Sequence, residues 1–270
     1  MDEPLGLSMA TENEHLQLAF DGPVATIAFN RPQARNALTG GMLQGLVAAL
    51  GECSAREDLR VVVLRGAGEL AFSAGYNLGE LPSHPLSAGD ARAIHAPVRQ
   101  AAQAIALCRH PVLAAAHRFV IGAGLDLFCH ADMRICTEGC SFVMPPNKYG
   151  FVYPMEGLAA LAQAAGAARA ADMLLTSQPL SSEQALACGL VQRVLKPEAF
   201  EAELAALAQT LAANAPLSMR ASKQALRAMQ ASPASDQACY QHMADCLNSH
   251  DSREAMTAFR EKRTPVFTGR

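Results

Sequence analysis

Two glycine turns, each placed directly after a strand-like hydrophobic run, constrain this chain more than any other feature. The first turn, Phe72–Leu78, follows the run Val61–Leu64, and the second turn, Gly122–Gly124, follows the run Val112–Ala115. Each turn leads into a segment of helical character. The first N–H groups of a helix lack intrahelical partners and carry the positive end of the helix dipole, so such turns can bind an anion. Either turn alone is typical of any α/β protein, but two turns brought together predict an oxyanion hole.

Composition narrows the class of protein. The 270 residues are 50% hydrophobic and 17% charged, which is typical of one large globular domain or of a domain with an appendage. A net charge of −3, with Lys and Arg scattered along the chain, argues against a nucleic-acid partner. The eight cysteines include no CxxC pair, which argues against a zinc site and a disulfide framework. The start of the chain lacks a signal-peptide pattern, and no run approaches about 18 uninterrupted apolar residues, so we expect a cytoplasmic protein without a membrane partner.

The order of the predicted elements indicates an α/β fold. Apolar alternation around Asp21-Gly22 predicts an opening β-hairpin over residues 16–29. Strand–turn–helix units follow, and they imply a sheet with parallel pairing and crossover helices. The Pro-, Ser-, Gly- and His-containing stretch over 82–90 predicts a loop close to the first turn. The predicted helices and strands of these units cover residues 39–54, 61–64, 91–108, 112–115 and 133–136.

The second half of the chain becomes progressively helical. The segment Ser181–Gln184 starts a short helix that ends at Gly189, and a strand over 190–194 follows. Pro197 suits the first turn of a further helix, and helical windows rich in Ala and Leu continue beyond a break at Pro216. We therefore divide the chain into a flexible N-terminus over 1–13, an α/β core over 14–200 and a helical C-terminal segment over 201–270.

Taken together with the polar loop Asn30–Leu38, the two glycine turns resemble the crotonase (enoyl-CoA hydratase/isomerase) superfamily. The resemblance runs from about Leu16 to the C-terminus. It implies a crotonase-type ββα spiral core and an acyl-CoA thioester that enters as substrate, with no resident cofactor or metal. It also implies a homotrimer or a dimer of trimers, because in this family the C-terminal region packs across subunits.

The resemblance assigns roles to residues in both turns. It places the oxyanion-binding amides on Tyr76 and Ala123, where the backbone N–H groups hold the thioester oxygen as it becomes an enolate. The Tyr76 side chain can at the same time be an ordinary packed aromatic. Without the resemblance, the loop is a polar turn before a capped helix, and the basic end of the chain is a solvated surface. The residues that the resemblance brings to coenzyme A are Ala34, Arg35, Asn36, Ala37, Leu38, Ala74, Leu78, Phe259 and Lys262.

The acid–base positions depart from those of the family's hydratases. These enzymes carry one glutamate two residues after the second turn and another about twenty residues later. This chain has Asp126 at the first position and Pro146 at the second. Proline can neither move a proton nor hold a water molecule, so the departure weakens the hydratase and isomerase assignments. Asp126 is either a base or a structural acid at the start of a helix.

The segment 142–153 resembles the methylmalonyl-CoA decarboxylase branch of the superfamily, as does the C-terminal end 258–270. That branch has proline at the position of Pro146 and a tyrosine at the position of Tyr153. Decarboxylation needs no general base, because loss of CO₂ itself delivers the enolate, and a tyrosine hydroxyl is enough to orient the departing carboxylate. Tyr153 is alternatively a buried tyrosine whose hydroxyl bonds to the backbone. The match is partial, because this chain has Tyr76-Asn77 where the branch has His and Asp.

The sequence therefore predicts a carbon–carbon lyase that acts on a coenzyme A thioester. The alternatives are an enoyl-CoA hydratase or isomerase that uses Asp126, and an acyl-CoA binder without catalytic activity. Several histidines lack the spacing of metal ligands and are expected to be structural or to lie on the surface, unless the fold brings them into the pocket. These histidines are His84, His95, His110 and His117.

Overall fold

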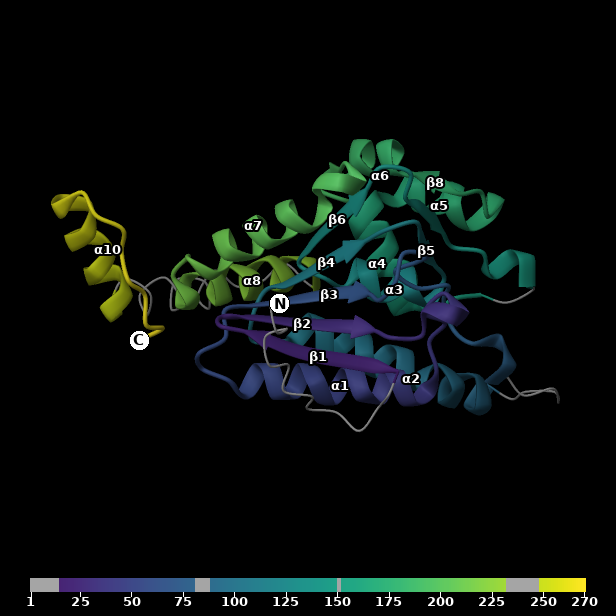
Figure 1. The fold of residues 1–270 in the computed structure, drawn as a ribbon. Helices are drawn as coiled ribbons and strands as arrows, with labels where there is room; N and C mark the ends of the chain where they lie inside the picture. Colours follow the sequence, from purple (N-terminus) through teal and green to yellow (C-terminus); the bar gives the residue numbers. More distant parts are fainter. Residues whose placement is uncertain (1–14, 81–87, 150–151, 232–247) are drawn as a thin grey trace, which may run out of the picture.

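The computed structural model describes residues 15–80, 88–149, 152–231 and 248–270 (Figure 1). The predicted flexible N-terminus over 1–13 lies outside the described residues, as does most of the predicted loop after the first turn. Helices and strands alternate as far as residue 195, and the regular elements of the described residues after that point are helices.

A six-stranded sheet forms the centre of the molecule. Its strands pair in the order β1-β2-β3-β4-β6-β9. The hairpin β1–β2 is antiparallel, and every later pairing in this sheet is parallel, as the strand–turn–helix units predict. The strands are β1 (Leu16–Asp21), β2 (Val24–Phe29), β3 (Val61–Gly66), β4 (Val112–Ala116), β6 (Met133–Thr137) and β9 (Arg193–Leu195).

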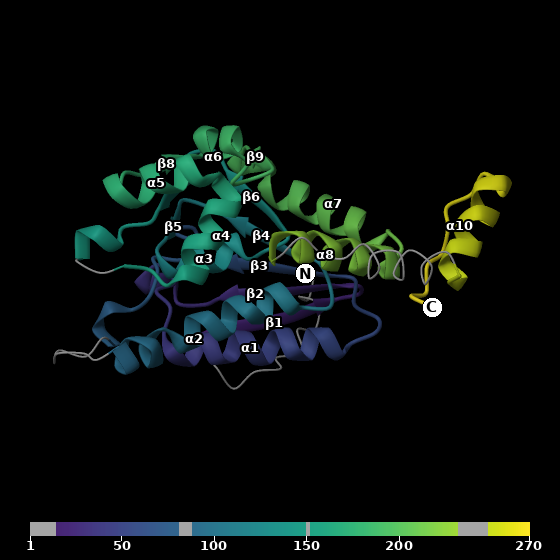
Figure 2. The same ribbon diagram turned by 180° about the vertical axis from the view of Figure 1, so that it is seen from behind.

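The central strands are apolar throughout because helices cover both faces of the sheet. Val62 and Leu64 of β3 belong to the core beneath α1 (Gly40–Ala55) and α2 (Ala88–Leu107). Val61 and Val63 alternate with them and pack with α7 (Phe200–Ala212) on the other face. Figures 1 and 2 show these helices on opposite sides of the strands. A continuous hydrophobic strand is the expected consequence of burial on both faces.

A three-stranded sheet extends the fold beyond the second glycine turn. It pairs β5 (Phe119–Ile121) with β7 (Ser141–Val143) in parallel, and β7 with β8 (Leu180–Ser181) in antiparallel fashion. The helices around it are α3 (Ala123–Cys129), α4 (Met155–Ala165), α5 (Ala167–Thr176) and α6 (Ser182–Cys188). In the part of the chain that the structure describes, no helix has the length and hydropathy needed to cross a bilayer.

Two predicted boundaries are wrong by a few residues. The last strand begins at Arg193 rather than at residue 190, because Arg134 donates from its Nε to the carbonyl of Leu190 and from its backbone N–H to the Gln192 side chain. These bonds hold residues 190–192 outside the regular ladder. Helix α2 begins at Ala88, so the end of the predicted 82–90 loop is helical.

Several predicted helix ends are confirmed. Thr39 caps α1 through its side chain, which accepts from the N–H of Met42 at 3.2 Å. Ser181 and Gln184 form a reciprocal capping box at the start of α6, and Gly189 ends that helix in the left-handed conformation. After a 3-10 turn η4 (Pro197–Ala199), α7 runs into the predicted break, and α8 (Pro216–Ala231) begins at the proline.

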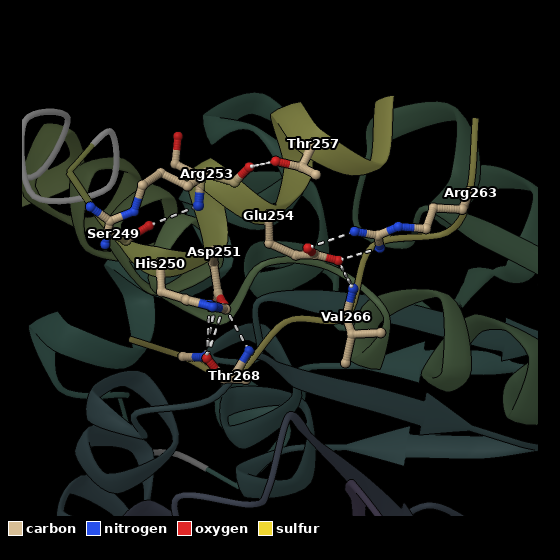
Figure 3. A network of polar contacts seen from close by, with 11 residues as sticks. Ser249, His250, Asp251, Arg253, Glu254, Thr257, Arg263, Val266 and Thr268 are labelled. Carbon is tan, nitrogen blue, oxygen red and sulfur yellow. Dashed lines mark hydrogen bonds and ion pairs between the residues drawn. The ribbon is translucent and has the colours of Figure 1, made fainter. Parts of the chain in front are cut away.

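The last helix, α10 (His250–Glu261), projects beyond the end of the sheet that is opposite to α3 and β5 (Figure 1). Two acids of its first turns hold the tail that follows it (Figure 3). Asp251 accepts hydrogen bonds from the N–H groups of Thr268 and Gly269 at 2.7 and 2.8 Å. Glu254 pairs with Arg263 at 2.6 Å, and these bonds give the helix and its tail a fixed local shape.

Candidate active site

The first glycine turn is fixed by a short parallel bridge between Leu38 and Tyr76. The N–H of Leu38 donates to the carbonyl of Gly75 at 2.8 Å, and the N–H of Asn77 donates to the carbonyl of Leu38 at 2.8 Å. In such a bridge the two residues that flank Tyr76 make the bonds to the partner, so the N–H of Tyr76 itself points to the other side. No described hydrogen bond uses this N–H group.

The second turn starts α3. Gly122 has φ 56° and ψ −122°, a backbone conformation that glycine alone adopts readily. Its N–H donates to the carbonyl of Val143 at 2.9 Å, and its carbonyl accepts from the N–H of Asp126 at 3.0 Å. Ala123 is the first residue of the helix and is 3% exposed, so its N–H has no intrahelical partner.

The fold brings these two turns against each other. Ser73 and Val120 form a bridge, in which the N–H of Ile121 donates to the carbonyl of Ser73 at 3.0 Å. A Cβ atom built on Gly75 would lie 3.5 Å from the backbone nitrogen of Ala123. The two unpaired amides therefore share one neighbourhood, which is the arrangement that an oxyanion hole needs, and that role stays a prediction.

The predicted coenzyme A loop is tied to the first turn through buried polar groups. The fully buried amide of Asn36 donates to the carbonyls of Ala67 and Ala71, at 3.0 and 2.8 Å. Arg35 and Asn36 both have left-handed backbone conformations, with φ 51° and 55°. The carbonyl of Asn36 accepts from the Ser73 hydroxyl at 2.8 Å. These hydrogen bonds therefore join the predicted coenzyme A loop and the first glycine turn into one unit.

The remaining predicted coenzyme A contacts of this region lie at the rim of the same unit. Ala74 donates its N–H to the carbonyl of Arg35 at 2.9 Å. Ala34 and Ala37 are partly buried, and Leu78 is 47% exposed at the start of the 3-10 turn η2 (Leu78–Glu80). An exposed leucine beside a polar loop is suited to cover part of a long ligand.

Asp126 lies in the first turn of α3, three residues after Ala123, and its carboxylate is 2% exposed. A Cβ atom on Gly157 would lie 3.0 Å from its Oδ2 atom. The Oδ1 atom accepts no hydrogen bond among the described residues, and the Nε2 atom of His130 lies 3.4 Å from it. That contact becomes an ion pair only when the imidazole is protonated.

Tyr153 lies beside the second turn, in the segment just before α4. Its hydroxyl oxygen lies 3.4 Å from the position that a Cβ atom on Gly122 would occupy. The Cδ1 atom of its ring lies 3.1 Å from the position that a Cβ atom on Gly157 would occupy. Burial, reinforced by the nearby Asp126, raises the pKa of the Tyr153 phenol. The hydroxyl therefore stays protonated and is able to donate a hydrogen bond next to the second turn.

Pro146 begins the 3-10 turn η3 (Pro146–Tyr149) and is buried. The position at which the family's hydratases carry their second glutamate therefore offers neither a carboxylate nor an N–H donor. The structure places the predicted acid Asp126 beside Gly157 and Tyr153.

Sequence reasoning missed two histidines of this region. The His95 ring, on α2, makes a T-shaped contact with the Tyr153 ring at a centroid distance of 6.1 Å. Burial lowers the pKa of His95, against the opposing effects of Asp126 and Glu156. No sequence spacing predicts the position of His95, because it lies far from Tyr153 along the chain. His130 follows Asp126 by four residues on one helix, so the i, i+4 spacing was an available signal.

The C-terminal residues are not brought to the site of their own chain. Phe259 belongs to α10, and Lys262 is exposed just after this helix, with φ 55°. Figure 1 places α10 at the far end of the sheet from α3 and β5. Contact of these residues with coenzyme A on another copy stays a prediction. No group of three His, Cys, Asp or Glu side chains within the described ranges has the arrangement of a metal site.

Comparison with known proteins adds a family and a fold. The family described as enoyl-CoA hydratase/isomerase matches residues 19–270. The short-chain-enoyl-CoA hydratase of Clostridium acetobutylicum is 30% identical over 254 residues, which cover 93% of this chain and 97% of the relative. The carnitinyl-CoA dehydratase of Salmonella typhi is 32% identical over 269 residues, covering 96% and 100%.

Solved structures agree in fold. A crystal structure of an enoyl-CoA hydratase/carnithine racemase from Magnetospirillum magneticum superposes with a TM-score of 0.91 at 36% identity, over 96% of this chain and 97% of that one. The enoyl-CoA hydratase of Bacillus anthracis superposes with a TM-score of 0.85 at 27% identity, over 95% and 100%. The predicted crotonase-type fold is confirmed, and the closer likeness to the methylmalonyl-CoA decarboxylase branch stays a prediction.

Proposed function

Because the chain belongs to the enoyl-CoA hydratase/isomerase family, we propose that it cleaves a carbon–carbon bond of an acyl-CoA thioester by loss of CO₂. The carbon–carbon bond breaks, its electron pair passes into the thioester as an enolate, and the carboxylate departs as CO₂. The N–H groups of Tyr76 and Ala123 stabilise the negative charge that develops on the thioester oxygen. Donors that are already fixed in place favour this charged state over the neutral ground state.

The observation that carries the proposal is the presence of both Pro146, in place of an acid, and Tyr153 in the same predicted site. A hydration site needs a positioned proton donor and a group that orients water, and Pro146 supplies neither. The Tyr153 hydroxyl, held protonated beside Gly122, is a suitable donor to a substrate carboxylate next to the thioester. Loss of CO₂ requires orientation of the carboxylate rather than its deprotonation.

Asp126 then completes the reaction. The enolate must gain a proton at its α-carbon, and Asp126 is a buried acid next to the second turn. Its proton passes to the carbon, which yields the decarboxylated acyl-CoA and leaves an ionised carboxylate to be protonated again.

The test is release of CO₂ from malonyl-CoA and methylmalonyl-CoA by the purified protein. We expect turnover of at least one ester, and we expect Tyr153→Phe to slow it about 10–100-fold, as loss of one positioned hydrogen bond of about 1.5–3 kcal/mol implies. Coenzyme A affinity should change little. Tyr149→Phe is the matched control, because Tyr149 is 60% exposed. Absence of CO₂ release together with fast hydration of crotonyl-CoA would contradict the proposal.

Hydration or dehydration through Asp126 is the second candidate. Its support is the name of the relatives, an enoyl-CoA hydratase and a carnitinyl-CoA dehydratase, together with the burial of Asp126 beside Ala123. Under this candidate Asp126→Asn abolishes hydration while Tyr153→Phe has little effect. A protein that binds acyl-CoA esters but converts none of them would instead be a binder.

We also propose a trimer or a dimer of trimers located in the cytoplasm. Large apolar side chains of α8 and α10 are exposed in the single chain, among them Leu226, Met229 and Met256. The six described cysteines carry free thiols, which suits a reducing compartment.

A further inference from the structure

The two carboxylate oxygens of Asp126 face different parts of the molecule. Oδ2 lies on the side of Gly157, where a Cβ would come within 3.0 Å of it, and this side also holds the Tyr153 ring. Oδ1 lies 3.4 Å from the Nε2 atom of His130, one helical turn later on α3. Residues four apart on a helix are neighbours on one face, so this contact follows from the helix itself.

His130 lines a cavity of about 680 Å³, and Tyr153 is not among the residues that line it. The cavity lies between the end of α3, α4, α7 and α8, and Figure 2 shows α8 beside this part of the core. The His130 side chain is 19% exposed, whereas Asp126 is 2% exposed. The imidazole is therefore the polar group that reaches from the buried carboxylate toward water.

The surroundings of His130 carry both signs of charge. Asp126 lies beside His130, and the cavity itself is lined by one acid, Asp132, and by three cations, Arg134, Lys223 and Arg227. Asp132 is engaged by Lys223 at 2.7 Å and by Arg227 at 2.9 Å. Among the described residues, none of these three cations pairs with Asp126, whose Oδ1 atom lies beside His130.

We propose that His130 is the proton relay of Asp126. When Asp126 has given its proton to the substrate α-carbon, a protonated His130 passes the proton on its Nε2 to Oδ1. The imidazole then takes up a proton from bulk solvent through the cavity, so that the net proton consumed comes from the buffer. Each step moves one proton and no other atom. A bound acyl-CoA covers the Tyr153 side of Asp126 during turnover, so the carboxylate needs a second route to solvent. The inference rests on the proposed role of Asp126 as proton donor.

The backbone of His130 has a separate structural role that substitution leaves in place. Its N–H donates to the carbonyls of Leu127 and Phe128 at the end of α3. A change of side chain therefore tests the imidazole without removing this cap. Truncation to alanine also vacates the volume of one imidazole at the wall of the cavity, which makes chemical rescue feasible.

The experiment measures exchange of the α-protons of propionyl-CoA in D₂O, which needs the relay and the enolate but no loss of CO₂. We expect His130→Ala to slow exchange by about 10²-fold, the lower end of the effect of a positioned acid or base. Imidazole at millimolar concentration should restore at least about a tenth of the lost rate. Rescue by added imidazole should vanish in the double variant Asp126→Asn, His130→Ala. Added imidazole should also leave the exchange rate of His250→Ala unchanged, because the His250 side chain belongs to α10.

The outcomes separate the relay from the proposed function. His130→Ala exchanging at the wild-type rate, or a loss that imidazole does not restore in a folded protein that still binds coenzyme A, would overturn the relay. Exchange by the wild-type protein without CO₂ release from any carboxylated ester would refute the decarboxylase proposal and leave the relay standing. Absence of exchange in wild-type protein saturated with propionyl-CoA would overturn the relay as well.

Discussion

Gly124 and Ser73 are in such close contact that a Cβ atom on Gly124 would lie 2.6 Å from the Cβ of Ser73. Ser73 in turn donates its hydroxyl to the carbonyl of Asn36 at 2.8 Å and accepts from the N–H of Gly75 at 3.1 Å. The second glycine turn, the first glycine turn and the predicted coenzyme A loop therefore meet at one buried serine. Any shift of Ser73 displaces both predicted oxyanion amides.

The first prediction is that Gly124→Ala lowers both stability and activity. The new methyl group has to push Ser73, and overpacking of this kind costs about 1–3 kcal/mol of unfolding free energy. Turnover should fall further than the loss of folded protein explains, because the predicted oxyanion amides of Tyr76 and Ala123 move apart. Gly51→Ala is the matched control: Gly51 lies in α1 with no atom within 4 Å of an added Cβ. There we expect stabilisation by about 0.5–1 kcal/mol and unchanged activity in urea unfolding and turnover assays.

The second prediction concerns Asn36. Its amide satisfies two buried carbonyls, and its Oδ1 accepts from the N–H of Arg31 at 2.9 Å. Asn36→Ala leaves these groups unpaired, so we expect a loss of about 2–3 kcal/mol of unfolding free energy. The loop loses its shape at the same time, and coenzyme A should bind at least about tenfold more weakly in calorimetry.

Asn147→Ala serves as the control for this substitution, since the exposed Asn147 side chain makes a comparable bond to the carbonyl of Leu174. It should change stability by less than about 0.5 kcal/mol. Equal losses in the two variants would show that burial of the Asn36 amide is not the source of its effect.

The parts of the fold that sequence reasoning predicted are those specified locally. The capping box at Ser181, the proline break at Pro216 and the fully apolar run at Val61–Leu64 each depend on a few neighbouring residues. The pairing of His95 with Tyr153 depends on how α2 crosses α4, and no local pattern encodes that crossing. The bonds of Arg134 that delay β9 are likewise tertiary.

The third prediction concerns the reaction. Pro146→Glu restores a carboxylate at the position that the family's hydratases use, and we expect hydration of crotonyl-CoA to rise from a slow baseline. Removing the proline also frees the backbone of η3, which loosens this segment. Pro146→Gln introduces the same backbone change and a similar volume without the acid, so it should not raise the rate. A similar gain in both variants would mean that the backbone, and not the carboxylate, limits hydration.

The fourth prediction is that the protein sediments as a trimer or hexamer at micromolar concentration. In the single chain, Leu226 and Met229 of α8 are 62% and 71% exposed, and α10 projects away from the sheet (Figure 1). Apolar side chains grouped on C-terminal helices favour burial against other copies. Sedimentation as a monomer would contradict this prediction and would also leave Lys262 without a site to reach.

The last prediction is a pH dependence of stability that originates at His110. Its ring is 4% exposed, and its Nε2 lies 3.1 Å from the carbonyls of both Cys53 and Arg56. Burial, reinforced by Arg109, lowers the pKa of His110 to about 4 from an ordinary value of 6.5. The unfolded chain therefore binds a proton at His110 between pH 6.5 and pH 4 that the folded protein excludes. The stability contribution is fully present above pH 6.5 and is lost as the pH falls, by about 3 kcal/mol at pH 4.

His110→Gln isolates this effect, because the glutamine amide can donate to the same carbonyls and does not titrate. Carboxylates that protonate in the same range contribute equally to both proteins, so the difference between their unfolding free energies reports His110 alone. In urea unfolding, we expect the wild-type protein to lose stability relative to the variant as the pH falls from 6.5 to 4. Parallel pH profiles would mean that the His110 imidazole takes up its proton without leaving its buried place.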